Sequence, residues 1–310
     1  MYIIRDWLNS EPNQKFNAVL TIGVFDGLHL GHQSIVKRIV AEAKRLKAAS
    51  LLLTFDPHPL AVLSSAVPPE ILTTFASKAT ILKSFGLDVL GRFVFNEAFK
   101  DISAQDFFSK VILSRVNPLS IVVGPDFRFG RNAEGNVETL GQLASNQKIT
   151  LEVVKLLKDG NALYSSSHIR SLLKLGLVGP ASKALGRPYR LSGQVARAEG
   201  RGRTLGYPTA NLENIPQLVP GPGVYAVMAR LRGEARAAMT SVGSNPTFRG
   251  RRLTVETNIF DFNDDFYGEY LELDFIEFIR GIIRFDGPET LIGQLALDER
   301  RAREILSASI

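Results

Sequence analysis

Two of the four histidines in this 310-residue chain lie three positions apart in the segment GVFDGLHLGHQ, residues 23–33, directly after an apolar run. Three glycines interrupt the same segment: Gly23, Gly27 and Gly31. Glycine lets the backbone approach a phosphate closely, and a helix that follows such a turn points its unpaired amides at the same place. His29 and His32 would add side-chain donors there. The spacing therefore favours a phosphate-binding turn.

Two other interpretations of this histidine pair stay open from the residues alone. A short motif of this kind often arises by chance, and two histidines can simply satisfy the carbonyl groups of a turn. A metal site is less favoured, because no third nitrogen or thiolate ligand lies nearby in the sequence. The elements on either side of the turn must decide between these interpretations.

The composition is that of an ordinary globular protein, with 45% hydrophobic residues, 22% charged residues and a mean hydropathy of +0.04. No cysteine occurs, which excludes disulfides, thiolate zinc sites and cysteine nucleophiles. The net charge of +6 and the pI near 9.5 favour anionic partners such as nucleic acid, a membrane surface or small phosphorylated substrates. The arginines are scattered among glycines and short strands, which weakens the nucleic-acid interpretation.

The N-terminal segment MYIIRDWLNSEPNQKF lacks the long apolar core and small-residue cleavage site of a secretory leader. No uninterrupted apolar stretch reaches the length that spans a membrane. Together with the absence of cysteine, this predicts a cytoplasmic protein with no membrane partner.

Short apolar runs alternate with amphipathic stretches over residues 18–154, which predicts a parallel sheet with helices on both faces. Residues 165–185 read as two short helices. After GRPYR, strand-like runs follow one another through Gly, Pro and Asn turns, which predicts an antiparallel barrel or sandwich, closed by a helix over residues 288–306. We expect two domains, 1–186 and 187–310. In this arrangement the histidine turn follows a strand of the parallel sheet, where α/β proteins bind ligands.

The histidine turn also resembles the HxGH motif of the nucleotidyltransferase superfamily, whose histidines contact ATP phosphates. Three further motifs resemble, in order, the adenylyltransferase module of the bacterial bifunctional riboflavin kinase/FAD synthetase family: TFDPHP at 54–59, VVGPDFRFGRNAEGN at 122–136 and YSSSHIRSLLKLG at 164–176. Four others resemble its riboflavin kinase module: GRTLGYPTANL at 202–212, GVYAV at 223–227, SVGSNPTF at 241–248 and VETNIFDFNDDFYG at 255–268. The resemblance implies a Rossmann-like nucleotidyltransferase domain followed by a β-barrel kinase domain.

For the first domain, the resemblance implies that His29 and His32 act in catalysis. It further implies an ATP site formed by Gly23, Phe25, Asp26, Gly27, His29, Gly31, His32, Ser165, Ser166 and Arg170. It places flavin contacts at His58, Asp126 and Phe127, although Asp126 could be a turn former and His58 structural. The chain departs from the family's usual I-S-S-T-R-I-R at Tyr164, Ser167 and His168, so we expect one phosphate-facing cation to be weaker.

For the second domain, the resemblance implies that Glu256 is the general base. It makes Thr209 and Asn211 ligands of magnesium, whose preferred donors are hard oxygen atoms. It adds ATP contacts at Gly202, Gly206, Thr209 and Asn211, and flavin contacts at Tyr207, Asn245 and Phe248. Taken alone, Pro-Thr-Ala-Asn would read as a turn between strands, and Glu256 as an exposed strand residue unless it faces the barrel interior.

The function implied is ATP-dependent phosphorylation of riboflavin to FMN, then adenylylation of FMN to FAD with release of pyrophosphate. The small-molecule partners are riboflavin, FMN, FAD and ATP, with Mg²⁺ as the metal that accompanies ATP. We expect no nucleic-acid partner and a monomer or weak oligomer. Two alternatives remain: only one working module, most plausibly the kinase, or a nucleic-acid-binding protein on a retained nucleotide fold.

Overall fold

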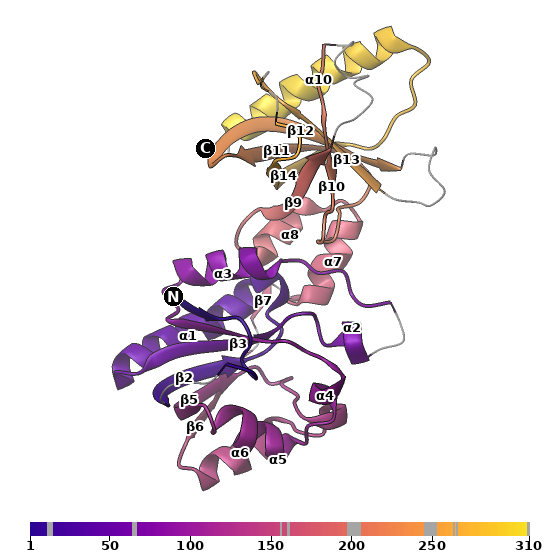
Figure 1. The fold of residues 1–310 in the computed structure, drawn as a ribbon. Coiled ribbons are helices and arrows are strands. Elements are labelled where there is room, and N and C mark those ends of the chain that lie inside the picture. Colours follow the sequence, from indigo (N-terminus) through magenta and orange to yellow (C-terminus); the bar gives the residue numbers. More distant parts are fainter. Residues whose placement is uncertain are drawn as a thin grey trace. The chain divides into compact units, whose positions relative to one another are not determined.

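The computed structural model describes residues 1–10, 15–63, 67–155, 157–159, 162–196, 206–244, 253–262, 264 and 266–308. The chain divides into two compact units, Met1–Tyr164 and Ser165–Ile310 (Figure 1). Each unit has its own sheet and its own core, and each is described by itself below.

The first unit is built on a six-stranded sheet in which every neighbouring pair is parallel. Its strands, in spatial order, are β1 (Tyr2–Ile4), β4 (Val89–Phe93), β3 (Ala49–Phe55), β2 (Phe16–Ile22), β5 (Val116–Val123) and β6 (Thr150–Val153). From β2 the chain moves to β3 and β4 on one side and returns to β5 on the other. The order of the strands therefore reverses between β2 and β5, and such a switch point is where open α/β sheets bind ligands.

Helices cover both faces of this sheet, as the alternation of apolar and amphipathic segments predicts. The helical segments are η1 (Asp26–Leu28), α1 (Leu30–Leu46), α2 (Leu60–Leu63), α3 (Phe75–Ser84), α4 (Glu97–Lys100), α5 (Ala104–Asp106), η2 (Phe107–Ile112), η3 (Arg131–Ala133) and α6 (Val137–Asn146). A short hairpin of β7 (Lys158–Asp159) and β8 (Ala162–Leu163) completes the unit. The parallel α/β fold is confirmed.

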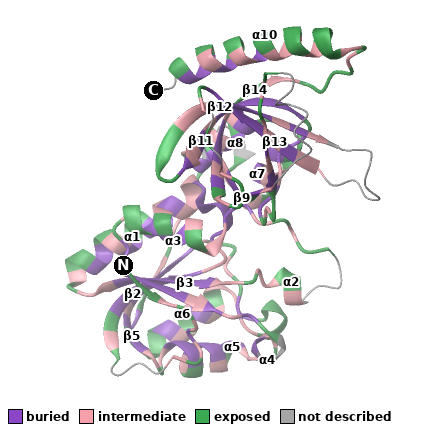
Figure 2. Ribbon diagram, turned by 45° about the horizontal axis from the view of Figure 1, so that its top comes forward, coloured by how far each residue is buried: buried purple, intermediate pink, exposed green. Residues whose placement is uncertain are grey.

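Strand alternation divides the core of the first unit into two apolar clusters, one on each face of the sheet. Val19 and Leu52 join the cluster that α1 and α3 cover, whereas Leu20 and Leu51 join the cluster on the opposite face. Figure 2 shows the resulting buried central strands. Because both faces are covered, the central strands are mostly apolar.

The second unit is a closed antiparallel barrel of six strands. In spatial order these are β10 (Ala210–Glu213), β13 (Leu253–Ile259), β12 (Glu234–Ser244), β11 (Gly223–Leu231), β14 (Tyr270–Arg280) and β9 (Tyr189–Ala196). Alternate residues such as Tyr225, Val227 and Phe275 are fully buried. The predicted barrel is confirmed. The segment Pro-Thr-Ala-Asn is more than a turn, because its last two residues, Ala210 and Asn211, begin β10.

Among the described residues, two helices pack directly on this barrel and a third packs on one of them. The predicted terminal helix is α10 (Pro288–Ser307), which buries Ala302, Ile305 and Leu306 against β11 and β12. The two predicted short helices are α7 (Ser166–Lys174) and α8 (Val178–Leu185). α8 packs on β14 and β9, so both helices belong to the compact unit of the barrel.

Candidate active sites

The histidine turn lies at the carboxyl end of β2, beside the point where the strand order reverses. Phe25 and Gly27 both have positive φ, 50° and 78°, and this sharp turn leads into α1. His29 is the N-cap of α1, and its Nδ1 accepts the backbone N–H of His32 at 3.4 Å. Because Nδ1 accepts, a neutral His29 carries its proton on Nε2.

The two imidazoles form a stacked pair whose ring centroids are 3.7 Å apart. The ring of His32 also lies against the ring of Phe25, with a centroid distance of 5.0 Å, and Phe25 is buried in the core cluster under α1. A Cβ at Gly31 would meet the His29 ring at 3.1 Å, so glycine at this position leaves room for the stack. The structure therefore brings Phe25, His29, Gly31 and His32 together, as the sequence motif predicts.

The electrostatic environment keeps His32 neutral. Burial holds the pKa of His32 well below its usual range, and the nearby His29 and Lys78 lower it further. Its Nδ1 is buried and has no hydrogen-bond partner among the described residues. A neutral imidazole keeps one donor and one acceptor nitrogen, so His32 can serve as a hydrogen-bond donor near neutral pH.

Asp26, predicted as an ATP contact, is engaged with the chain itself. It is 4% exposed, and its carboxylate accepts the backbone N–H groups of Leu72, at 2.9 and 3.0 Å, and Thr73, at 3.1 Å. These bonds tie the histidine turn to the segment that precedes α3. Sequence reasoning had no signal for this partner, because Leu72 is 46 positions away.

The three predicted flavin contacts of the first unit follow the two strands that flank β2. His58 follows β3, and its Nδ1 accepts the N–H of Leu60 at 3.2 Å. Asp126 and Phe127 follow β5; Asp126 is exposed, whereas Phe127 is partly buried and stacks on Phe129 with a centroid distance of 5.4 Å. Carboxyl ends of adjacent parallel strands meet at one edge, so these residues share the edge of the histidine turn.

The serine-rich segment is divided between the units. Tyr164 ends the first unit, and Ser165 begins the second, where it caps α7 by accepting the N–H of His168 at 3.2 Å. Ser166 and Arg170 lie in the first turns of α7. The helix is as predicted, and the contacts of Ser165, Ser166 and Arg170 with ATP stay predictions.

In the second unit, Glu256 and Asn211 are direct cross-strand partners on β13 and β10. Glu256 alternates with Val255 and Thr257, which are buried inside the barrel, so its side chain points to the outer face and not into the interior. It is half-buried there, and burial raises the pKa of its carboxyl group. A partly desolvated carboxylate beside an amide is a suitable proton acceptor.

The segment before β10 is held to the same outer face. Asn258, two positions beyond Glu256, donates its side-chain amide to the carbonyl oxygen of Pro208 at 2.7 Å. This bond fixes the residue next to Thr209. Asn258 was missed by the sequence reasoning, although its place in V-E-T-N, on the same face of the strand as Glu256, is a signal that could have found it.

The remaining predicted residues of the second unit have separate outcomes. Gly206 is exposed with φ of 79°. Tyr207 packs against the cluster between the barrel and α10, and burial together with Glu299 raises the pKa of its phenol. Gly202, Asn245 and Phe248 lie outside the described residues. The flavin contact of Tyr207 stays a prediction.

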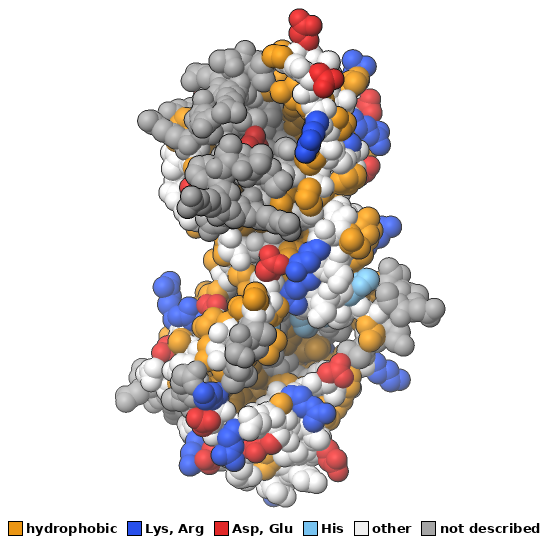
Figure 3. All heavy atoms as spheres, turned by 90° about the vertical axis from the view of Figure 1, so that its right-hand side faces the viewer, with side chains coloured by type: hydrophobic (Ala, Val, Ile, Leu, Met, Phe, Trp, Pro, Cys, Tyr) orange, Lys and Arg blue, Asp and Glu red, His pale blue; other side chains and the backbone are white. Residues whose placement is uncertain are grey.

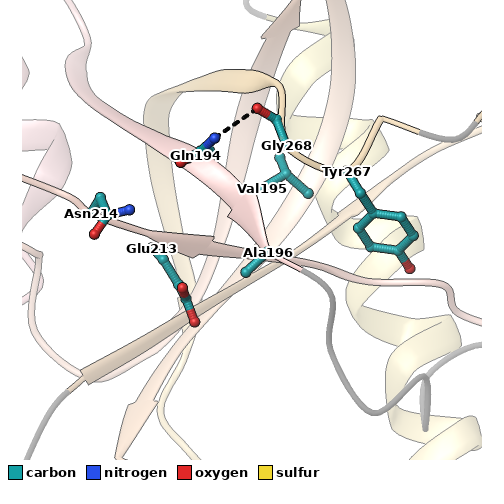
Figure 4. A pocket seen from close by; sticks show the side chains of 7 residues that line it. All are labelled: Gln194, Val195, Ala196, Glu213, Asn214, Tyr267 and Gly268. Carbon is teal, nitrogen blue, oxygen red and sulfur yellow. Dashed lines mark hydrogen bonds between the residues drawn. The ribbon is translucent and has the colours of Figure 1, made fainter.

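A pocket of about 380 Å³ opens on the barrel at β9 and the end of β10. It is lined by Gln194, Val195, Ala196, Glu213, Asn214, Tyr267 and Gly268 (Figure 4). Ala196 is the cross-strand neighbour of Asn211 on the side away from Glu256.

Comparisons with known proteins match both units. Residues 11–168 match the family model for FAD synthetase, and residues 185–306 match the family model for riboflavin kinase. The chain is 35% identical over 290 residues to the bifunctional riboflavin kinase/FMN adenylyltransferase of Listeria monocytogenes, covering 93% of this chain and 92% of that protein. It is 31% identical to the Escherichia coli K12 protein of the same name, covering 98% and 97%. The chain belongs to the bifunctional riboflavin kinase/FMN adenylyltransferase family.

The family assignment confirms the resemblance seen in the sequence, and the chain carries both an FAD synthetase domain and a riboflavin kinase domain. The compact units divide at Tyr164 and Ser165, whereas the two family models end at residue 168 and begin at residue 185. That the domains for the two activities meet between residues 186 and 187 stays a prediction.

A solved structure extends the likeness over the whole fold. The chain matches a crystal structure described as a macrolide-efflux protein from Streptococcus pneumoniae, with a TM-score of 0.89 and 32% identity over 98% of this chain and 99% of that one. No helix among the described residues of our chain is long and apolar enough to cross a membrane.

The structure offers limited support for the predicted magnesium site at Thr209 and Asn211 of the kinase domain. Among the described residues, no group of three or more His, Cys, Asp or Glu side chains could hold a metal ion. The predicted ligands, Thr209 and Asn211, instead offer neutral oxygen atoms on the segment that Asn258 fixes. Such donors suit a hard cation that arrives with the phosphates of ATP.

Proposed function

We propose that FMN is made from riboflavin and ATP at the Glu256 site of the second unit, and FAD from FMN and ATP at the histidine turn of the first. The observation that carries this proposal is that each unit holds a separate polar site of the appropriate chemistry. The first has stacked imidazoles at the switch point of a parallel sheet. The second has a half-buried carboxylate opposite an amide on a barrel wall.

Adenylyl transfer needs no nucleophile from the protein. An oxygen of the FMN phosphate attacks the α-phosphorus of ATP, and the bond to the leaving pyrophosphate breaks. His29 and His32 donate hydrogen bonds to the phosphate oxygens as charge develops there, and the first amides of α1 add positive potential. The neutral state of His32 supports this role, because it can donate without first gaining a proton.

Phosphoryl transfer to riboflavin needs a proton acceptor. Glu256 takes the proton of the terminal ribityl hydroxyl as that oxygen attacks the γ-phosphorus of ATP, and ADP leaves. The raised pKa of Glu256 supports this role, since a base works best when its pKa approaches the working pH.

Mg²⁺ is the metal we propose for the ATP substrate of the kinase site. Thr209 and Asn211 would hold it through their hydroxyl and amide oxygens, and when bound it neutralises the charge of the phosphates. Tyr207, Gly206 and the undescribed Gly202, Asn245 and Phe248 are assigned to ATP and flavin as the family resemblance implies.

We further propose a cytoplasmic enzyme without a nucleic-acid partner, acting as a monomer or weak oligomer. Both reactions consume ATP, which cytoplasm supplies. On the face shown in Figure 3, acidic and basic side chains are interspersed over the first unit, whereas nucleic-acid binding favours a gathered basic patch. Sedimentation with and without RNA tests the absence of a nucleic-acid partner and the oligomeric state.

Separate fragments test whether the activities reside in separate units. A fragment of residues 165–310 should fold and phosphorylate riboflavin without making FAD. A fragment of residues 187–310 should melt at a lower temperature, because it lacks the buried side chains of α7 and α8, among them Ile169, Leu173 and Leu185. Thermal unfolding and chromatography of products measure both. An insoluble or inactive 165–310 fragment would argue against an autonomous kinase unit.

A further inference from the structure

A buried lysine lies under the histidine turn, and the only role described for it so far is its influence on the pKa of His32. Lys78 belongs to α3 and is 4% exposed. Its Nζ donates to the carbonyl oxygen of Val24 at 2.7 Å and to Thr54 Oγ1 at 3.0 Å. The Thr54 hydroxyl in turn donates to the same Val24 carbonyl at 2.9 Å.

The Val24 carbonyl accepts both of these hydrogen bonds at the start of the turn. It lies between the end of β2 and Phe25, whose φ of 50° begins the sharp turn toward His29. Val24 is partly buried and its carbonyl has left the sheet, so the oxygen needs other donors, and here two come from side chains of neighbouring elements, α3 and β3. Two donors on one oxygen restrict the rotation of the peptide that joins Val24 to Phe25.

Asp26 makes a second connection between the turn and the α3 region. Its carboxylate binds the amides of Leu72 and Thr73, just before Thr74 caps α3. The side chain of Lys78 thus reaches from α3 to the turn, and the side chain of Asp26 reaches from the turn to the segment before α3. Together they leave the turn little freedom to move independently of α3.

The charge of Lys78 is costly in this place. Burial lowers its pKa to about 8, against the opposing influence of Asp26 and Asp56. An apolar side chain would fill the space without that desolvation cost, and buried charges are often replaceable in this way. A charge kept at such a cost calls for a reason other than stability. Lys78 acts electrostatically on His32, which is otherwise influenced by His29.

We propose that Lys78 is a positioning residue for adenylyl transfer, holding the Val24 carbonyl so that the turn presents His29 and His32 in the reactive geometry. This inference rests on the proposed role of the histidine turn. It adds a residue that does not touch substrate and acts through the backbone of Val24 and the charge near His32.

Lys78→Met tests the proposal, with Lys83→Met as the matched control on an exposed lysine of the same helix. Misplacing catalytic groups by about 1 Å can cost on the order of 100-fold, so FMN adenylylation should fall on that scale in Lys78→Met. Lys83→Met should retain it, and riboflavin phosphorylation should be unchanged in both. The melting temperature of Lys78→Met should not fall, because a desolvated charge is removed.

The pH profile separates positioning from a structural role. Without the Lys78 charge the pKa of His32 should rise, so the acidic limb of log(kcat/KM) for adenylylation should move to higher pH. Thr54→Val, which removes one donor to the Val24 carbonyl, should lose less adenylylation activity than Lys78→Met. Thr54→Ser, which keeps the hydroxyl, should retain that activity. Three results for Lys78→Met would each overturn the proposal. They are an adenylylation rate within about threefold of wild type, a loss of adenylylation with no movement of the acidic limb, and a loss of adenylylation accompanied by a lowered melting temperature. If the histidine variants keep FAD synthesis, the proposed function itself fails; if only Lys78→Met keeps it, this inference alone fails.

Discussion

Replacing both His29 and His32 by alanine is expected to abolish FAD formation from supplied FMN, while riboflavin phosphorylation continues at a near-normal rate. Each positioned donor to charge developing in a transition state is worth about 100- to 1,000-fold. The two imidazoles are stacked and His29 caps α1, so the double variant removes both donors together with the group that sets the start of the helix. Chromatography of flavins made from FMN and ATP measures the loss.

The single variants and the kinase reaction are the controls for this result. Kinase activity should be retained because the Glu256 site lies in a different compact unit. Thermal unfolding should show whether the first unit still folds. FAD synthesis by the double variant would show that the histidines only complete the turn, and loss of both activities would indicate a role in stability.

Glu256→Gln is expected to reduce riboflavin phosphorylation by about 100- to 10,000-fold, the usual contribution of a positioned general base. The change keeps the size of the side chain and much of its hydrogen bonding beside Asn211, so flavin and ATP binding should change little. Adenylylation of supplied FMN should continue. The variant would therefore make FAD from FMN but hardly any from riboflavin.

The stability of the same variant gives an independent check on Glu256. Burial raises the pKa of its carboxyl group in the folded state, so folding favours the protonated form. The carboxylate therefore destabilises the folded state once the pH rises above the unfolded value near 4.5. Glu256→Gln should melt higher than wild type at pH 7, and the difference should shrink toward pH 4.

The exposed strand residue Glu277 supplies the matched control, since Glu277→Gln should leave the kinase rate unchanged. Phosphorylation at a near wild-type rate in Glu256→Gln would mark Glu256 as an ordinary strand residue. Equal loss of both activities with a lowered melting temperature would point to a structural role.

Much of the fold could be predicted because its periodicities are local. Apolar runs such as SLLLTF predict buried strands, and the change to alternating strands after GRPYR predicts the antiparallel barrel. Strand order could not be predicted in this way, since it depends on packing between distant segments. The short strand β10 was equally hidden, because the four residues Ala210–Glu213 are too few to show an alternation.

The sites divide along the same line. The histidine turn and the Glu256 strand could be found because their motifs are contiguous. The partners that fix them could not: Asp26 binds Leu72, Asn258 binds Pro208 and Lys78 binds Val24 across 46, 50 and 54 positions. A lysine in an amphipathic helix normally reads as a solvated residue, so only the fold shows that Lys78 is buried. The direction of Glu256 also needed the structure, because alternation alone permits either face.

The most direct measurement combines the two defective enzymes in one reaction with riboflavin, ATP and magnesium. The His29→Ala/His32→Ala variant should stop at FMN, and the Glu256→Gln variant should form little FMN at all. Mixed together, they should make FAD, because FMN released by the first variant is adenylylated by the histidine turn of the second. Chromatography over time should show FMN appear before FAD. A mixture that makes no FAD, while each variant retains its expected single activity, would contradict the account of two independent sites in separate units of one chain.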